Sequence, residues 1–409
     1  MMREILVINS GSSSLKFALF GAPEGGELSE LALRFRGHLA GLGGQARLSL
    51  HDAEGRALET AGSALDALPA ELDHDTALER LLAWVEAHPD LGDIAAVGHR
   101  IVHGGHDHTD PVRLDASTLA ALESLNPLAP LHQPYGLAPV RVLSALRPAL
   151  PQVACFDTAF HAGQPEVARR FPLPRRYREA GVVRYGFHGL SYDYINRTLN
   201  ERVLPDRAGS GPAQGTPPGR VIVAHLGNGA SLCAMRDGVS QASTMGFTAL
   251  EGLMMGTRSG SLDPGLVLHL ILQEGMSAEA VQRMLYKESG LLGVSGISGD
   301  MRELLESGAP QASEAIELYV YRIVREIGSL AAALGGLDHL VFTAGIGERA
   351  APVRAAVVEG CQWLGAALDP VANRADSSDI AAANSRVGLW VIPTDEERMI
   401  AWYTASALA

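Results

Sequence analysis

The sequence predicts an α/β protein built from two domains that share a duplicated fold. The chain has 409 residues, 47% of them hydrophobic, which is more than one hydrophobic core usually holds. Short apolar runs alternate along it with helical patterns. Two of these runs lead into similar turns of small residues. This weak repeat indicates two related halves with an anion held between them.

The strand-like segments are apolar runs of four or five residues, and helical patterns lie between them. The pair Asp263-Pro264 predicts the start of a helix, and Asp300-x-x-Glu303 resembles a capping box. Apolar residues at helical spacing over 316–334 predict the longest helix. Residues 205–220 are rich in Gly and Pro and predict a surface insertion. The strand-like runs are residues 5–8, 15–19, 94–97, 153–156, 221–224, 339–342 and 389–392.

Composition and charge exclude several classes of protein. The net charge of -13 argues against a nucleic-acid or anionic-membrane partner. Six arginines within residues 169–184 are interrupted by proline and indicate a solvated face. The first apolar run is too short for a signal peptide, and no stretch approaches a membrane span. With only three scattered cysteines, we expect a cytoplasmic protein.

The two similar turns favour phosphate binding. NSGSSSLKF (residues 9–17) and HLGNGASL (residues 225–232) each follow an apolar run and lead into a second one, as in a tight hairpin. Glycine lets backbone N–H groups approach phosphate oxygens, and serine hydroxyls add further donors. The first turn also contains Lys16, one of only two lysines in a chain with 31 arginines. Two ordinary β-turns are the simpler alternative.

A third glycine-rich turn supports an alternative from a different class. Gly345-x-Gly347-x-x-Ala350 follows an apolar run and matches the dinucleotide fingerprint, with Asp369 placed downstream for a ribose hydroxyl. A nicotinamide-dependent oxidoreductase is therefore the rival prediction. It leaves both serine- and glycine-containing hairpins without a role. The sequence contains neither a P-loop nor an esterase nucleophile elbow.

Further stretches carry residues suited to phosphoryl transfer, which needs cations and donors around the transferred group. Arg100 and Arg258 lie in glycine-rich surroundings, Asp157 ends an apolar run, and Glu396 begins the last helix, where a helix cap is the alternative. Single histidines such as His188 are by default core residues. The histidines at 99, 103, 106 and 108 also allow a zinc site, although they lack a cysteine or a clear helical spacing.

Eight motifs, in order and across nearly the whole chain, resemble those of the acetate kinase family. The resemblance implies the actin-like phosphotransferase superfamily, with two ribonuclease H-like ββαβα-type domains and an active-site cleft between them. It also implies a homodimer that uses Mg2+ to transfer the ATP γ-phosphoryl group reversibly to acetate. A propionate or other short-chain carboxylate kinase of the same family is the closest alternative. The motifs are VINSGSSSLKF, GHRIVHGG, FDTAFH, YGFHG, HLGNGAS, EGLMMGTRSG, FTAGIGE and VIPTDEE.

The resemblance assigns roles by motif. The implied catalytic residues are Asp157, Arg100, Arg258 and His188. The implied contacts of ATP or ADP are Ser12, Ser14, Lys16, His225, Leu226, Gly227, Asn228, Gly229, Asp300, Met301, Arg302, Gly345, Ile346, Gly347, Glu348 and Arg349. The implied contacts of acetate are Arg100, Val102, Leu131, Phe187 and Ala249. The implied magnesium residues are Asn9 and Glu396.

We expect an N-terminal domain of residues 1–161 with 398–409, and a C-terminal domain of residues 162–397 that binds nucleotide and forms the dimer contacts. Some positions depart from the family pattern, and Ala249 stands where proline is usual. These departures concern substrate size and nucleotide preference, because none is in the core catalytic set. The others are Gln133, Tyr135, Ser261, Gly299 and Arg349.

Overall fold

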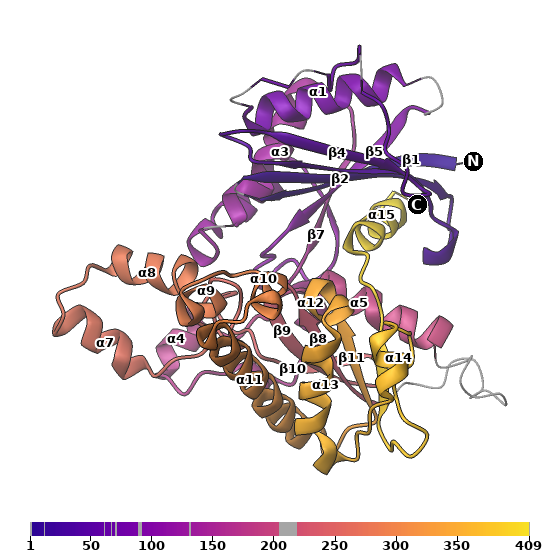
Figure 1. Ribbon diagram of the computed structural model, residues 1–409. Coiled ribbons are helices and arrows are strands. Elements are labelled where there is room, and N and C mark those ends of the chain that lie inside the picture. Colours follow the sequence, from indigo (N-terminus) through magenta and orange to yellow (C-terminus); the bar gives the residue numbers. More distant parts are fainter. Residues whose placement is uncertain are drawn as a thin grey trace. The chain divides into compact units, whose positions relative to one another are not determined.

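The computed structural model describes residues 2–11, 13–60, 62–66, 68–69, 72–88, 92–130, 132–203 and 219–408. The chain forms two compact units (Figure 1), one of Met1–Ala159 with Asp395–Ala409 and one of Phe160–Thr394. The chain therefore crosses between units at 159/160 and 394/395. From the sequence we predicted these crossings at 161/162 and 397/398. Residues 395–397, which were predicted to belong to the C-terminal domain, therefore lie in the first unit.

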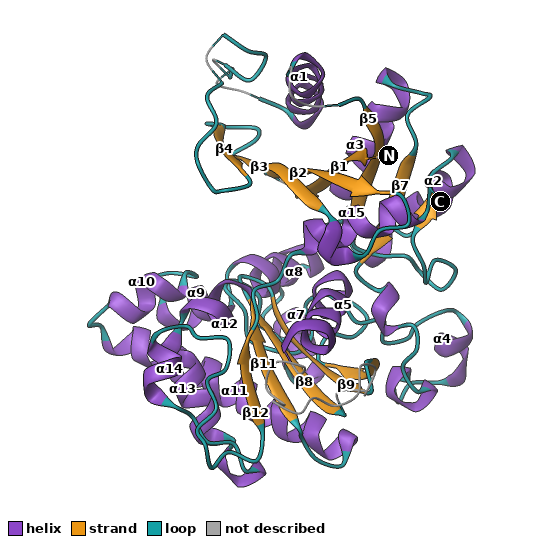
Figure 2. Cartoon of the chain, turned by 90° about the vertical axis from the view of Figure 1, so that its right-hand side faces the viewer, coloured by secondary structure: helices purple, strands orange, loops and turns teal. Residues whose placement is uncertain are grey.

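The first unit contains a seven-stranded sheet in the order β4-β3-β2-β1-β5-β7-β6. β1, β5 and β7 are parallel neighbours, and the other pairs are antiparallel. Leu6, Ile8 and Phe17 face a core shared with α1 and α3. Figure 2 shows α15 on the opposite face, where a Cβ on Gly98 would lie 2.2 Å from Thr404 Oγ1. The strands are β1 (Met2–Gly11), β2 (Ser14–Pro23), β3 (Ala32–Ala40), β4 (Arg47–Asp52), β5 (Ile94–Ile101), β6 (Val112–Arg113) and β7 (Gln152–Phe156), and the helices are α1 (His74–Ala87), α2 (Ala116–Glu123), α3 (Gln133–Leu146) and α15 (Glu396–Ser406).

The second unit contains a five-stranded sheet in the order β10-β9-β8-β11-β12. β8, β11 and β12 are parallel neighbours, whereas β9 and β10 are antiparallel to their neighbours. α11 packs against β8, β9 and β10, and its Tyr319, Ile323 and Ile327 are fully buried. The strands are β8 (Arg220–Leu226), β9 (Ala230–Arg236), β10 (Val239–Ser243), β11 (His339–Thr343) and β12 (Gly388–Val391). The helices are α4 (Arg175–Glu179), α5 (Gly189–Thr198), α7 (Pro264–Leu272), α8 (Ala278–Lys287), α9 (Gly290–Ser295), α10 (Met301–Glu306), α11 (Pro310–Leu334), α12 (Ala344–Arg349), α13 (Ala351–Gly360) and α14 (Pro370–Arg374).

The two sheets repeat one topology, which confirms the predicted duplication. β3-β2-β1-β5-β7 and β10-β9-β8-β11-β12 have the same strand order and the same strand directions. Each begins with a hairpin, closed by Gly11 and Ser14 in the first unit and by Leu226 and Ala230 in the second. These are the two similar turns of the sequence, and each lies at the same position in its sheet.

All seven predicted strands are present, but other predictions need correction. β3, β4 and β10 were missed because their exposed polar residues interrupt the apolar pattern, and β6 was missed because it has only two residues. The capping box is wrong: the Asp300 side chain accepts from the Arg302 N–H, two residues on. The helix start at Asp263 and the long helix α11 are confirmed. Of the predicted insertion, residues 205–218 lie outside the described residues. No helix in the described part of the chain is both long and apolar enough to cross a membrane.

Candidate active site

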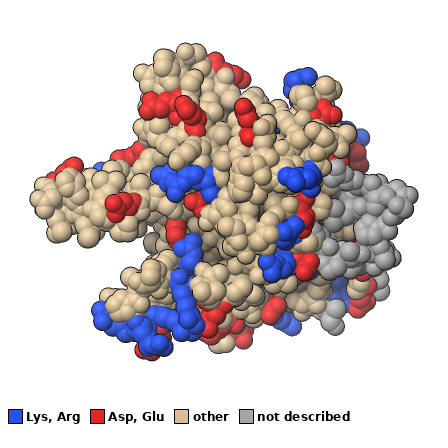
Figure 3. Space-filling view, turned by 90° about the horizontal axis from the view of Figure 1, so that it is seen from below, with Lys and Arg blue, Asp and Glu red and all other residues tan. Residues whose placement is uncertain are grey.

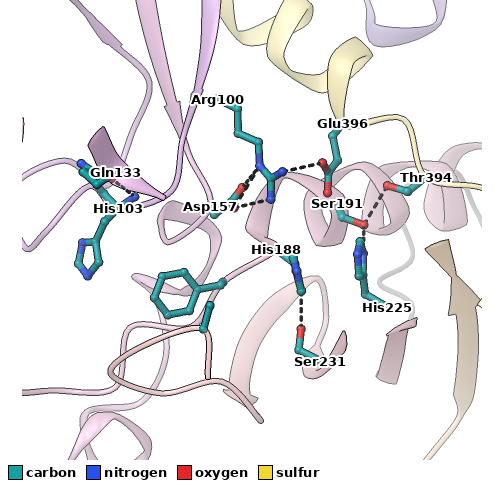
Figure 4. A network of polar contacts seen from close by, with 12 residues as sticks. Arg100, His103, Gln133, Asp157, His188, Ser191, His225, Ser231, Thr394 and Glu396 are labelled. Atoms are coloured by element: carbon teal, nitrogen blue, oxygen red, sulfur yellow. Dashed lines mark hydrogen bonds and ion pairs between the residues drawn. The ribbon is translucent and has the colours of Figure 1, made fainter. Parts of the chain in front are cut away.

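Arg100, Asp157 and Glu396 lie together in the first unit (Figure 4). β5 and β7 run in parallel, so their carboxyl ends meet: Arg100 lies near the end of β5 and Asp157 directly follows β7. The Arg100 Nε and Nη2 atoms donate to the two Asp157 carboxylate oxygens at 3.0 and 2.7 Å. Its Nη1 atom lies 3.6 Å from Oε2 of Glu396, the first residue of α15. A single guanidinium is thus held between two carboxylates.

Burial and charge together set the ionisation of this group. Burial raises the pKa of Asp157 above its ordinary value, Arg100 opposes that rise, and Glu396 adds to it. Burial alone would lower the pKa of Arg100, but the charges of Asp157 and Glu396 outweigh it and raise that pKa. The Asp157 side chain is 2% exposed and that of Arg100 is 22% exposed. Arg100 is therefore a fixed cation, and it is the member of this pair that a small ligand can reach.

The oxygen donors of this unit fit magnesium. Mg2+ is usually bound by one or two carboxylates and completes its octahedron with water and substrate phosphates. Glu396 supplies a carboxylate that is 14% exposed, and Asn9, also predicted for this role, lies near the end of β1. Among the described residues, no three His, Cys, Asp or Glu side chains are grouped to hold a metal by themselves. Glu396 and Asn9 could therefore each supply one oxygen ligand to a magnesium ion.

Two of the four histidines considered for zinc, His99 and His103, have other contacts. His99 Nε2 lies 2.8 Å from Gln152 Oε1, and His103 Nδ1 accepts from the Gly105 N–H at 2.9 Å. Burial lowers the pKa of both histidines to about 4, so both rings are neutral near pH 7. Their contacts are those of core histidines.

The first hairpin presents a lysine on the α15 side of the sheet. Lys16 pairs with Asn9 on β1 and with His38 on β3. It lines a cavity of about 260 Å³ together with Arg36, His38 and Glu397. Ser14 begins β2, whereas Ser12, the third predicted phosphate contact of this turn, lies outside the described residues.

His188 begins the site in the second unit. It is the N-cap residue of α5 and has a left-handed backbone with φ of 60°, a conformation that non-glycine residues adopt mainly where the surroundings enforce it. Its Nδ1 atom lies 2.8 Å from Ser231 Oγ, which also bonds the Tyr192 hydroxyl. A Cβ built on Gly229 would lie 3.4 Å from His188 Nε2. The second ring nitrogen therefore lies beside the turn between β8 and β9.

Arg258 lies beside the same glycine. Its Nη1 atom would be 3.5 Å from a Cβ on Gly229, and it donates to the Ala249 carbonyl at 3.0 Å. The turn is also joined to the segment before Arg258, because the Gly256 N–H donates to the Asn228 carbonyl at 3.1 Å. The structure thus brings His188 and Arg258 together around Gly229.

A chain of hydrogen bonds links His225, at the end of β8, to the end of the unit. The His225 and His188 rings stack with centroids 4.1 Å apart. His225 Nδ1 lies 2.9 Å from Ser191 Oγ, which lies 2.8 Å from Thr394 Oγ1 (Figure 4). The Thr394 N–H donates to Glu348 Oε1 at 3.2 Å. Thr394 is the last residue before the chain returns to the first unit.

The predicted adenosine residues begin two short helices. Asp300 caps α10, pairs with Arg302 at 2.6 Å, and precedes the buried Met301. The segment Gly345–Arg349 belongs to α12, which directly follows β11. Ala344 has a left-handed φ of 64°, and its Cβ would be 3.6 Å from a Cβ on Gly227. α12 therefore begins beside the turn that His188 and Arg258 flank.

The dinucleotide fingerprint does not have its predicted environment. Gly345, Gly347 and Ala350 lie within and directly after α12, which ends after six residues. Asp369, predicted for a ribose hydroxyl in that alternative, accepts from the Val371 and Ala372 N–H groups and caps α14. Its position is explained by helix capping.

The predicted substrate residues divide between the units. Val102 directly follows β5 in the first unit, whereas Phe187 and Ala249 belong to the second. Phe187 is buried, and its carbonyl lies 2.9 Å from His161 Nε2. Leu131 lies outside the described residues.

Sequence reasoning missed several members of these networks. Ser231, which bonds His188, lies in the quoted HLGNGAS motif, and His161 closes the quoted FDTAFH motif. Those positions were therefore available as signals. Thr394 likewise lies in the quoted VIPTDEE motif, but Ser191 lies in none of the quoted motifs. Their pairing carried no signal, because 203 residues separate them along the chain and only the fold brings them together.

Comparisons with known proteins show which family the chain resembles. A family model described as the acetokinase family matches residues 4–402. An acetate kinase of Rhodopseudomonas palustris is 51% identical over 400 residues, covering 97% of this chain and 96% of that protein. An acetate kinase of Methylocella silvestris is 48% identical over 411 residues, covering 100% of this chain and 98% of that protein.

Solved structures show the same likeness. The acetate kinase of Porphyromonas gingivalis superposes with a TM-score of 0.84 at 36% identity over 100% of both chains. A propionate kinase of Francisella tularensis gives a TM-score of 0.87 at 33% identity, covering 98% of this chain and 99% of that one. These likenesses confirm the predicted duplicated actin-like fold, and the oxidoreductase alternative is wrong.

Proposed function

This chain belongs to the acetokinase family, and we propose that it transfers the γ-phosphoryl group of ATP reversibly to acetate, giving acetyl phosphate and ADP. The class of reaction, phosphoryl transfer to a carboxyl group, is that of the family. Within the site, the observation that supports it best is the buried Asp157 carboxylate clamped by Arg100. Such a group offers a fixed cation for an anionic substrate and a fixed anion next to it.

The reaction needs little covalent assistance from the protein. Acetate is already ionised near neutral pH, so one of its oxygens can attack the γ-phosphorus in line without a general base. The new O–P bond forms as the bond from that phosphorus to the ADP oxygen breaks. The protein therefore has to orient two anions and stabilise the charge on the transferred group.

Residues of the first unit would hold the acceptor. The Arg100 guanidinium would bind an oxygen of the carboxylate or of the transferring phosphoryl group, while Asp157 fixes the orientation of that guanidinium. Asn9 and Glu396 would hold Mg2+, which when bound offsets the charge of the ATP phosphates. Lys16 and Ser14 would add a charge and a donor from the first hairpin.

Residues of the second unit would hold the donor. Arg258 and the His188 Nε2 atom flank Gly229, where the lack of a side chain leaves room for phosphate oxygens. The loop from His225 to Gly229 would contact the phosphates. Asp300 to Arg302 and Gly345 to Arg349 would contact the adenosine.

The experiment that tests this function measures acyl phosphate directly. The protein is incubated with ATP, Mg2+ and each carboxylate from one to four carbons, and acyl phosphate is trapped as the hydroxamate. We expect acetate to give hydroxamate at a rate that depends on Mg2+. If propionate or a longer acid gives a much higher kcat/KM, the chain is instead a kinase for that acid. If no acid gives hydroxamate, the proposal is wrong.

A homodimer is also proposed, through α7. This helix is rich in leucine, yet none of its residues is buried within the chain. Leu266, Leu268 and Leu272 are 45%, 56% and 70% exposed. α7 extends furthest left in Figure 1, and the same arm in Figure 3 carries few charged side chains. An apolar helix of this kind is typical of a surface that a partner covers.

Light scattering after gel filtration tests the homodimer. We expect twice the mass of one 43.2 kDa chain, and about one chain mass for the double variant Leu268→Glu, Leu272→Glu. Val371→Glu is the matched control, because Val371 is 67% exposed on the separate helix α14. A wild-type protein of one chain mass would contradict the proposal.

We also propose a cytoplasmic location, which the three buried free cysteines support.

A further inference from the structure

The segment Gly186-Phe187-His188 carries left-handed backbone at both ends. Gly186 has φ of 78° and His188 has φ of 60°. Glycine adopts this conformation readily, but histidine does so only where its surroundings fix it. In the proposed function, Phe187 forms part of the wall around the substrate's methyl group and His188 contacts the transferred phosphoryl group. The contacts that hold this segment in place would therefore affect the position of Phe187 at the substrate and the position of His188 at the phosphoryl group.

His161 makes the closest of these contacts. Its side chain is fully buried, and its Nε2 atom lies 2.9 Å from the Phe187 carbonyl. A carbonyl oxygen only accepts, so Nε2 carries the hydrogen. The Nδ1 atom lies 2.9 Å from Ser240 Oγ and 3.3 Å from Gln164 Nε2, so both ring nitrogens are paired. Burial lowers the pKa of His161 to about 4, so the ring is neutral and keeps this arrangement near pH 7.

The imidazole ring of His161 also explains Gly186. A Cβ built on Gly186 would lie 2.5 Å from His161 Cδ2, closer than non-bonded atoms approach. The backbone of the segment thus lies directly against the ring, and residue 186 has no room for a side chain.

A second contact of His161, with Tyr192, connects it to the His188 side chain through Ser231. The His161 ring meets the Tyr192 ring edge to face, with centroids 5.6 Å apart. The Tyr192 hydroxyl bonds Ser231 Oγ, which in turn lies 2.8 Å from His188 Nδ1. His161 therefore contacts the backbone that precedes His188. It also contacts Tyr192, whose hydroxyl orients Ser231, the hydrogen-bond partner of the His188 imidazole.

We propose that His161 is a positioning residue of the reaction, which holds Phe187 against the substrate and His188 toward the phosphoryl group. The proposal rests on the proposed function for the roles of Phe187 and His188. It does not make His161 a catalytic residue, because its two ring nitrogens bond Phe187 and Ser240 and face no reacting atom. Its effect would come through the geometry of the segment, where a misplacement of about 1 Å can cost on the order of 100-fold in rate.

Two amide substitutions separate this role from mere core packing. In His161→Gln the amide nitrogen takes the place of Nε2 and can still donate to the Phe187 carbonyl. In His161→Asn the amide reaches only the position of Nδ1, so the bond to Ser240 can persist and the bond to Phe187 is lost. Both variants are uncharged and remove the same ring, which makes them matched.

The measurements are kcat and KM for ATP, acetate and propionate, together with Tm. We expect His161→Gln to stay within about threefold of the wild type. We expect His161→Asn to lose about tenfold in kcat and to change the propionate-to-acetate ratio of kcat/KM by about threefold or more, with the KM for ATP nearly unchanged. Equal losses in the two variants, or an unchanged ratio in His161→Asn, would overturn the proposal.

Ser240→Ala keeps the test decisive if His161→Asn does not fold. It leaves the imidazole in place and removes the nearer of the two partners of Nδ1, while Gln164 Nε2 at 3.3 Å remains. We therefore expect a smaller shift of the propionate-to-acetate ratio of kcat/KM, and an unshifted ratio would count against the proposal. The wild-type hydroxamate assay separates the two levels of inference. A wild type without carboxylate kinase activity would refute the proposed function itself, whereas an active wild type with an unaltered ratio in the variants would refute only the role of His161.

Discussion

At the scale of single residues, the two arginines of the site are held in different ways. Arg100 is clamped by the Asp157 carboxylate, with Glu396 close to its third nitrogen. Arg258 donates to the Ala249 carbonyl and lies near Met255 Sδ. The first arrangement fixes the guanidinium through a buried carboxylate, whereas the second includes a bond to a backbone carbonyl. Removing either arginine should affect the chemistry.

Alanine at either position should lower kcat by about 100-fold or more, because each arginine would stabilise charge on the transferred phosphoryl group. Lysine should restore little activity, since it lacks the planar fork that binds two oxygens. Arg100→Ala should also lower Tm, because it leaves the buried Asp157 charge without its partner. Steady-state kinetics and thermal unfolding of the four variants check this. Turnover close to wild type in either alanine variant would remove that arginine from the site.

Ala249 bears on substrate size. The family resemblance places a proline here in a small pocket for the methyl group, and alanine removes about two carbons of that wall. One extra methylene in an apolar pocket is worth on the order of 1 kcal/mol. The wild type should therefore have a propionate-to-acetate kcat/KM ratio several-fold higher than that of Ala249→Pro. The variant keeps the carbonyl that Arg258 uses. Equal ratios would show that another side chain closes the pocket.

At the scale of structural elements, the turn between β8 and β9 brings the predicted groups of the second unit together. It places Gly229 against both His188 and Arg258, and Gly227 beside Ala344 at the start of α12. A turn without side chains leaves its backbone open to a ligand, which is how glycine-rich loops hold phosphates.

Gly229→Ala should fold normally and bind nucleotide poorly. Its Cβ would make ordinary contacts of 3.4 and 3.5 Å with His188 and Arg258, but it would occupy the space between them. We expect the KM for ATP to rise or kcat to fall by about tenfold. Gly308→Ala is the control, because no atom lies within 4 Å of its added Cβ. A Gly229→Ala enzyme with wild-type kinetics would show that phosphate does not approach this turn.

The sequence predicted the elements of the site better than their connections. Apolar runs revealed both hairpins and the strands that carry Arg100, Asp157 and His225, because buried parallel strands have continuous apolar patterns. The strands β3, β4 and β10 carry exposed polar residues that interrupt the apolar pattern, and they were missed. Pairings such as Ser191 with Thr394 depend on how distant segments pack, and nothing local in the chain encodes them.

At the scale of the whole molecule, acid sensitivity follows from histidines buried in both units. His99 and His103 in the first unit and His161 in the second each have a pKa lowered from 6.5 to about 4, chiefly by burial. Unfolding exposes them to protonation below pH 6.5. The stability that each provides is therefore complete above pH 6.5 and is lost as the pH falls toward 4.

Between pH 7 and pH 5 this loss should amount to about 2 kcal/mol for each histidine. Tm should accordingly fall over that range. His161→Gln has one titrating group fewer, so its Tm should fall less between the two pH values than that of the wild type. Thermal unfolding of both proteins at pH 7 and pH 5 measures the difference. An identical fall in the two proteins would mean that His161 is not buried as a neutral ring.

The central claim is that Asp157, where the parallel strands β5 and β7 end, serves a carboxylate kinase reaction and is more than a cap on its strand. The most direct measurement is hydroxamate formation from acetate, ATP and Mg2+ by the wild type, Asp157→Asn and Asp115→Asn. Asp115 only caps α2, a role that asparagine fills equally well, so its variant should match the wild type. Asparagine keeps an oxygen that accepts from Arg100, which also stays beside Glu396, so Asp157→Asn should fold with a smaller loss of Tm than Arg100→Ala. It should retain less than about 1% of the activity, because the charge that fixes the guanidinium is lost. A folded Asp157→Asn protein with substantial activity would contradict the account.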